Sequence, residues 1–173
     1  MLRVVGANLI WTGTAALADT EIACDETGLV MSAASVGSAG TGVEVLDATG
    51  CVITPGLVNA HHHLLQTAFR TLPGTRGVPM RDWLPRMAAA YAAAGIDAEL
   101  TYVCASVGLA EALLCGVTTV ADHQLNWPSG GDGVAIARSV ARAADELGAR
   151  LVFVRGSARE RTNRRAAKAR GFC

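Results

Sequence analysis

Three of the four histidines in the chain stand together, as His61, His62 and His63, directly after the apolar run Leu57–Ala60. Alternate side chains of an extended strand point to the same side, so His61 and His63 can face one way while His62 points away. Two neutral imidazoles at this spacing can bind one Zn²⁺ or Fe²⁺ ion. The triplet therefore predicts part of a site for one divalent metal ion, and the alternative is a histidine-rich surface turn.

The segments that must position these histidines alternate between strand and helix. Three apolar runs are predicted as buried strands of a parallel sheet, at residues 57–60, 117–122 and 150–154. Helices are predicted between the strands, at residues 82–94, 97–115 and 133–147. Such a βαβαβ order implies parallel strands with helical crossovers. The first strand is not followed by the GxGxxG turn of a dinucleotide-binding fold, which favours the first strands of a (β/α)8 barrel over a doubly wound sheet.

The first 55 residues have a different pattern. Short strand-like segments are separated by Gly, Asp, Ser and Thr, at residues 2–11, 21–24, 29–32 and 43–47. They predict a small β region made of hairpins, without a cluster of catalytic residues. The predicted domains are this region at 1–55, barrel units at 56–157 and a basic tail at 158–173.

Composition narrows the class of protein. The chain is 51% hydrophobic and 17% charged, which is typical of a chain with a sizeable core. No apolar run approaches the roughly 20 residues of a membrane span, and the apolar start Met1–Gly6 is too short for a signal peptide. We therefore expect a cytoplasmic protein with no membrane partner. The five cysteines show no CxxC spacing and are expected to be buried thiols.

The segment Val52–Leu64, with the sequence VITPGLVNAHHHL, resembles the PGLxNxHxH segment that opens the barrel of metal-dependent amidohydrolases. The segment Gly116–His123, GVTTVADH, is similar to the second barrel strand of that superfamily. The resemblance implies that His61 and His63 bind one divalent metal ion, zinc being expected and iron the alternative. It also implies an α/β fold: the first strands of an incomplete (β/α)8 TIM-type barrel, preceded by part of a small composite β-sandwich.

Within the superfamily, the HHH triplet followed by Gln66, Thr67 and Arg70 is most similar to 8-oxoguanine deaminases. It also resembles the atrazine chlorohydrolase and hydroxyatrazine hydrolase relatives, so a small heterocyclic substrate is implied. Gln66 is the first candidate for substrate binding, with a solvated loop amide as the alternative. Arg70 could bind substrate or pair with an acid. Trp83 could form a pocket wall or lie in the core, and His123 could reach the cavity or make a structural hydrogen bond.

The resemblance also defines what this chain lacks. Such enzymes use a metal ion to activate water for attack on an electron-poor ring carbon, while a carboxylate transfers protons and ammonia leaves. The family supplies further histidines, an HxxE glutamate and a final aspartate from later strands, whereas no histidine follows His123 here, and Asp122 is not at the family's final ligand position. With only three predicted barrel strands, we expect exposed sheet edges and a chain that is unstable or dependent on association.

The tail departs from the family pattern. Residues 1–154 carry eight Arg and 14 acidic residues, a net charge of −6, whereas residues 155–173 carry seven basic residues and one acid, a net charge of +6. We interpret the change after Ser157 as a frameshift, in the gene or in its sequencing. A basic arm for nucleic acid is the competing interpretation, but Phe172 is the only aromatic residue in the tail, so no nucleic-acid partner is expected.

The sequence thus predicts the N-terminal part of an amidohydrolase that acts on carbon–nitrogen bonds, such as the amino group of 8-oxoguanine. The general acid–base glutamate and the final aspartate are expected beyond this chain, and the full-length family member could be a homo-oligomer. Two alternatives remain. The chain could be an inactive fragment with no complete active site, or part of a triazine or other ring chlorohydrolase or deaminase.

Overall fold

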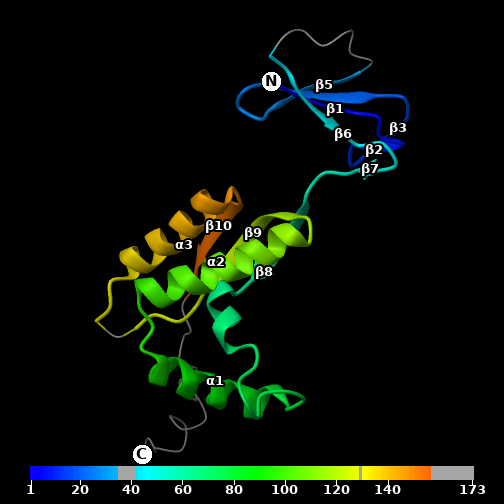
Figure 1. Ribbon diagram of the computed structural model, residues 1–173. Helices are drawn as coiled ribbons and strands as arrows, with labels where there is room; N and C mark the ends of the chain where they lie inside the picture. Colours follow the sequence, from blue (N-terminus) through cyan, green and yellow to red (C-terminus); the bar gives the residue numbers. More distant parts are fainter. Residues whose placement is uncertain (35–41, 129, 157–173) are drawn as a thin grey trace, which may run out of the picture. The chain divides into compact units, whose positions relative to one another are not determined.

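A computed structural model of the chain describes residues 1–34, 42–128 and 130–156. The chain divides into two compact units, Met1–Gly56 and Leu57–Cys173 (Figure 1). The predicted basic tail at 158–173 lies outside the described residues.

The first unit consists of two small sheets. In its described part the strands are β1 (Leu2–Val5), β2 (Leu9–Trp11), β3 (Ala16–Leu17), β4 (Glu21–Cys24), β5 (Val30–Ala34), β6 (Glu44–Asp47) and β7 (Val52–Ile53). One sheet has the order β5-β4-β1-β6 and the other β3-β2-β7. Hairpins account for the antiparallel pairs β4–β5 and β2–β3, but β1–β6 and β2–β7 are parallel. The prediction of hairpins alone was therefore wrong, because parallel pairs join segments distant in the sequence.

The single strand predicted over residues 2–11 is also interrupted. Gly6 has a φ of +76°, and a Cβ at this position would lie 2.7 Å from Oγ1 of Thr49. Only glycine combines this backbone conformation with so close a contact. The turn at Gly6 sends β1 and β2 into different sheets.

The second unit contains the predicted βαβαβ series. Its elements are β8 (Leu57–His62), the 3₁₀ helix η1 (Leu64–Phe69), α1 (Met80–Ala94), α2 (Ala98–Leu114), β9 (Val117–Gln124), α3 (Gly133–Leu147) and β10 (Arg150–Arg155). The three strands are parallel, in the order β10-β9-β8. In Figure 1, α2 and α3 lie side by side against one face of this sheet. The arrangement confirms the predicted α/β class and incomplete barrel.

Both helices begin at an aspartate. The Asp97 carboxylate accepts a hydrogen bond from the backbone N–H of Leu100, and that of Asp132 accepts two from Val134 and Ala135. These bonds satisfy amide groups that have no partner within a helix. The caps fix where α2 and α3 begin, close to the predicted boundaries.

The core of the second unit lies between these helices and β9. Residues of α2 and α3 with the spacing i, i+3, i+4, i+7, i+8 form the buried face of each helix. They are Thr101, Cys104, Ala105, Gly108 and Leu109 in α2, and Ile136, Ser139, Val140, Ala143 and Ala144 in α3. Leu64 from η1 and Val120 from β9 complete the cluster.

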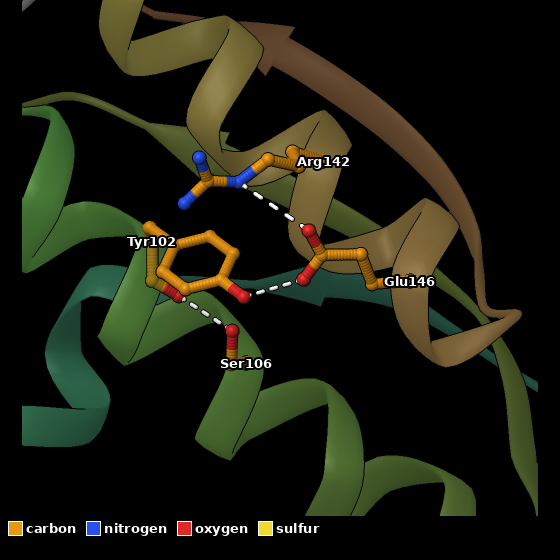
Figure 2. Close-up of polar contacts among 4 residues, drawn as sticks. All are labelled: Tyr102, Ser106, Arg142 and Glu146. Carbon is orange, nitrogen blue, oxygen red and sulfur yellow. Dashed lines mark hydrogen bonds and ion pairs between the residues drawn. The ribbon is translucent and has the colours of Figure 1, made fainter.

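A polar contact joins the outer edges of the two helices (Figure 2). The Tyr102 hydroxyl donates a hydrogen bond to the Glu146 carboxylate, and the guanidinium carbon of Arg142 lies 3.8 Å from the centroid of the Tyr102 ring. Arg142 also pairs with Glu146 one turn along α3, at 3.6 Å. The hydrogen bond and the cation–π interaction join α2 to α3, and the ion pair within α3 holds Arg142 and Glu146 together.

The burial of the first barrel strand differs from the prediction. The run Leu57–Ala60 was expected to be covered on both faces, but Leu57 and Val58 are 58% and 67% exposed. Within the described residues β8 pairs with β9 alone, so it is an edge strand. This result confirms the expectation that the sheet has an exposed edge.

The cysteines also differ from the prediction. Of the four cysteines in the described residues, Cys104 alone is buried; Cys51 and Cys115 are exposed, and Cys24 is intermediate. All four are free thiols. None of the helices in the described part of the chain combines the length and apolar character of a membrane span.

Candidate metal and substrate site

The carboxyl end of β8 brings two imidazole nitrogens together. Nε2 of His61 lies 3.2 Å from Nε2 of His63. Two Zn–N bonds of tetrahedral geometry place their nitrogens about 3.3 Å apart. The pair therefore fits two neighbouring ligand positions around one such ion.

A backbone carbonyl determines which nitrogen of His63 is available. Nδ1 of His63 lies 2.6 Å from the carbonyl oxygen of His123 on β9. Because a carbonyl only accepts, Nδ1 carries the proton, which leaves the lone pair of Nε2 free to bind a metal. The neighbouring strand thus selects the tautomer that a ligand requires.

His123 supports the pair rather than adding a third nitrogen to it. Its ring stacks on His61, with 4.2 Å between centroids and 28° between planes. Its Nε2 donates to the carbonyl oxygen of Ala60 at 3.3 Å. The backbone N–H of His61 donates to the side-chain oxygen of Asn59 at 3.2 Å, which orders the strand just before the histidines.

Asp122 connects β9 to the segment after the histidines. Its Oδ1 accepts a hydrogen bond of 2.8 Å from the backbone N–H of Leu64 at the start of η1. Burial raises the pKa of this carboxyl group, while the Leu64 amide and the nearby histidines oppose the rise. Sequence reasoning considered Asp122 only as a metal ligand and missed this positioning role, because the partner is a backbone group 58 residues away.

A cavity of about 180 Å³ opens at the histidines, and its lining residues are His61, His62, His63, Gln66, Thr67 and Arg70. His62 was expected to point away, yet it lines the same cavity. The pairing of β8 with β9 shifts register between Asn59 and His62, so simple alternation does not hold there. Burial lowers the pKa of His62, an effect that Asp122 partly opposes.

The other predicted substrate residues are placed differently. Gln66 lies on η1 rather than in an irregular loop and lines the cavity. Arg70 lines it as well and forms an ion pair with Glu111 at 2.6 Å. Trp83 lies half-buried on α1 and is not among the lining residues, and neither is His123.

Across residues 1–34, 42–128 and 130–156, no group of three or more His, Cys, Asp or Glu side chains is arranged to hold a metal ion. The histidine pair can therefore supply two ligands, fewer than the three or more that a metal site commonly needs.

Comparison with known proteins identifies relatives of this chain. Residues 52–172 match the model of the amidohydrolase family. The chain is 37% identical over 111 residues to 8-oxoguanine deaminase of Pseudomonas aeruginosa, a match that covers 64% of this chain and 24% of the relative. It is 33% identical to hydroxydechloroatrazine ethylaminohydrolase of a Pseudomonas species, covering 66% of this chain and 24% of that protein.

Comparison with solved structures also identifies similar proteins. The atrazine chlorohydrolase TrzN of Arthrobacter aurescens, complexed with zinc, superposes with a TM-score of 0.80 at 25% identity and covers 100% of this chain and 38% of its own. An E241Q mutant of that enzyme with zinc and atraton gives a TM-score of 0.79 at 28% identity, covering 90% of this chain and 35% of its own. The chain thus spans about a quarter of the length of the curated relatives it matches. With the family match across most of its length and the histidine pair at the end of β8, the chain belongs to the amidohydrolase family.

Proposed function

We propose that this chain supplies the first metal-binding segment of an amidohydrolase that removes an amino group from a purine-like ring such as 8-oxoguanine. The observation that carries the proposal is the 3.2 Å separation of Nε2 of His61 and Nε2 of His63. The similarity to an 8-oxoguanine deaminase supports the reaction class and the substrate.

In this proposal His61 and His63 hold one divalent metal ion. Zinc is preferred to iron because neutral imidazole suits it and because similar structures contain zinc. When bound, the ion supplies a Lewis acid that increases the acidity of water and polarises the ring. The carbonyl oxygen of His123 maintains the ligand tautomer of His63.

The remaining cavity residues would orient the ring. The Gln66 amide can both donate and accept at the edge of a heterocycle. Arg70 supplies a guanidinium whose charge is already balanced by Glu111, so it favours a neutral substrate over an anion. We assign His123 a supporting role, and the position of Trp83 on α1 gives no reason to assign it to the ring.

Catalytic turnover is proposed for a full-length protein of this family and not for this chain alone. The reaction needs a further metal ligand and a group that transfers protons, whereas the described residues offer the histidine pair. Similarity to atrazine chlorohydrolase favours a second candidate, in which water displaces a different leaving group from a triazine ring. The third candidate is a chain that binds a metal ion but catalyses no reaction.

The test is metal binding and product release by the purified chain. We expect zinc to bind at one ion per chain and His61→Ala or His63→Ala to lower the affinity at least tenfold, whereas His62→Ala has a smaller effect. Ammonia from 8-oxoguanine, ammonia from an aminotriazine and chloride from a chlorotriazine distinguish the candidate reactions. Equal effects of all three histidine substitutions on zinc affinity would contradict the assignment of the ligands.

A further inference from the structure

Gly108 lies in the interior of α2, where its backbone conformation does not require glycine. It is the one glycine of this helix, and its φ is outside the left-handed region. Glycine is less favourable than alanine inside a helix, because the unfolded chain loses more conformational freedom there. A helical glycine with ordinary dihedral angles is explained by the close approach of another segment.

The segment that approaches Gly108 is η1. A Cβ at position 108 would lie 2.8 Å from Oγ1 of Thr67 and 2.9 Å from Cδ2 of Leu64. It would also contact the His62 ring, with 3.8 Å to Nε2. The first two distances are shorter than real Cβ contacts, and Leu64 is completely buried, so its side chain has little room to move. The absence of a side chain at 108 therefore allows η1 to lie directly on α2.

One face of η1 makes this contact. Leu64, Thr67 and Arg70 are spaced by three residues, which places them on the same face of a helix with three residues per turn. Leu64 and Thr67 meet Gly108, whereas Arg70 pairs with Glu111 about one turn further along α2, at 2.6 Å. Both side chains of that ion pair are half-exposed, so it contributes little to stability. The close contact at Gly108 is therefore the main determinant of where η1 lies.

The histidine pair is held from a different side. His63 bonds the carbonyl oxygen of His123, and His61 stacks on the His123 ring, so β9 positions both candidate ligands. The η1 side of the same cavity consists of Gln66, Thr67 and Arg70. The cavity thus has a metal side, positioned by β9, and an η1 side, positioned by α2.

The cavity is small, at about 180 Å³, so its shape is sensitive to the position of η1. A methyl group at 108 would require Thr67 to move by roughly half an ångström to reach an ordinary contact distance. Gln66 precedes Thr67 on η1 and would move with it. Displacements of this order weaken hydrogen bonds that depend on precise placement.

We propose that Gly108 is a positioning residue of the histidine cavity: by leaving room for η1 on α2, it sets the distance between Gln66 and the histidine pair. The inference rests on the proposed function in one respect, namely that the ring lies between these groups. Ring binding then depends on α2, whereas metal binding depends on β9.

Gly108→Ala in the full 173-residue chain tests the inference, with folding verified by circular dichroism. Zinc affinity, measured by competition with a chromogenic chelator, should stay within about twofold, because the partner of His63 is unchanged. The affinity of the zinc-loaded chain for 8-oxoguanine, measured by calorimetry, should fall about tenfold. Val107→Ala is the control. It changes the adjacent residue on the exposed side of α2, and should alter neither affinity.

Hydrogen exchange gives a second test that needs no ring. The backbone N–H of Gln66 donates to the carbonyl oxygen of His63 at 2.9 Å. Gly108→Ala should accelerate exchange at this amide about tenfold, because η1 is displaced from α2. Thr67→Ala removes the nearest obstacle to a Cβ at 108, so Gly108→Ala should have a much smaller effect in that background.

Three results would overturn the inference. One is a loss of zinc affinity as large as the loss of 8-oxoguanine affinity, since Gly108 would then act on the metal side. Another is unchanged exchange at Gln66, and the third is an equal effect of Gly108→Ala with and without Thr67→Ala. If Gly108→Ala alone does not fold, Thr67→Ala should restore folding, and failure to restore it would also overturn the inference.

The two kinds of measurement separate this inference from the proposed function. An unaltered chain that binds zinc but not 8-oxoguanine contradicts the proposed substrate, and exchange at Gln66 in the single and double variants then decides the role of Gly108. Tight binding of both zinc and 8-oxoguanine that Gly108→Ala leaves unchanged supports the proposed function and overturns the inference.

Discussion

One side of the second unit is packed and the other is exposed. The inward face of α2 is buried against η1, α3 and β9, whereas its outward face exposes Val103, Val107 and Leu114. In the sheet, β9 has a strand on each side, whereas β8 pairs with β9 alone in the described chain. The strand that carries His61 and leads into His63 is therefore supported from one side, and β9 provides that support.

Helices α2 and α3 show the same contrast. Both bury residues at the same spacing. The exposed surface of α3 carries Arg138, Arg142 and Asp145 beside Val134, whereas that of α2 carries three large apolar residues beside Glu99 and Glu111. A helix with a single apolar face is complete once that face is covered. The difference shows that more of the apolar surface of α2 than of α3 is left uncovered.

The largest expected effect compares two leucines of α2. Leu109 is fully buried and Leu114 is 89% exposed. Leu109→Ala should lower the free energy of unfolding by about 3 kcal/mol, because it leaves a cavity in the core, and Leu114→Ala by less than about 0.5 kcal/mol. Urea unfolding followed by circular dichroism measures both. Similar losses would contradict the division into packed and exposed faces.

A pair of valines makes the same comparison within the sheet. Val120 of β9 is completely buried, whereas most of Val58 on β8 is exposed. Val120→Ala should lower the free energy of unfolding by about 2 kcal/mol, because it removes two buried methyl groups and leaves a cavity. Val58→Ala should change stability by less than about 0.5 kcal/mol. If Val58→Ala costs as much as Val120→Ala, β8 is covered in solution and is not an edge.

Asp122 tests how β9 supports the end of β8. Asp122→Ala removes the acceptor of the Leu64 N–H, and a buried amide without a partner costs about 1–2 kcal/mol. We expect faster hydrogen exchange at Leu64 as well as lower stability. Asp145→Ala, on the exposed surface of α3, is the control. Unchanged exchange at Leu64 would show that the bond does not order η1.

The smallest effect concerns two thiols, one buried within α2 and one at its C-terminal cap. Burial raises the pKa of the Cys104 thiol, and the thiolate is the form that reacts. Iodoacetamide at neutral pH should therefore modify exposed Cys115 well before Cys104, and Cys104 should react appreciably only as the pH rises. Mass spectrometry of timed samples measures each site. Comparable rates at neutral pH would mean that the inward face of α2 opens readily.

Local signals in the sequence were sufficient for much of this unit. Asp97 identified the start of one helix, because capping depends on neighbouring residues alone. The histidine pair was visible for the same reason. The exposure of Val58 could not be predicted. An apolar residue indicates that burial of its strand face is favourable, but it does not show whether another part of the chain covers that face.

Contacts between distant segments were likewise beyond the sequence. The Asp122–Leu64 bond and the Phe69–Tyr91 ring contact depend on how β9 and α1 are placed around η1. The 3₁₀ turn that carries Gln66 has no strong sequence signal, because such helices are short. The positioning role of Asp122 was therefore missed, whereas His61 and His63 were named as candidate ligands and a structural hydrogen bond was one of the two roles predicted for His123.

X-ray absorption at the zinc edge of the zinc-loaded chain tests the central claim most directly. If His61 and His63 hold the ion, the spectrum should show imidazole scattering from two ligands at Zn–N distances of about 2.0–2.1 Å. The scattering should fall to that of one imidazole in His63→Ala and remain that of two in His62→Ala. Zinc with no imidazole scattering, or a spectrum that loses an imidazole only in His62→Ala, would contradict the account.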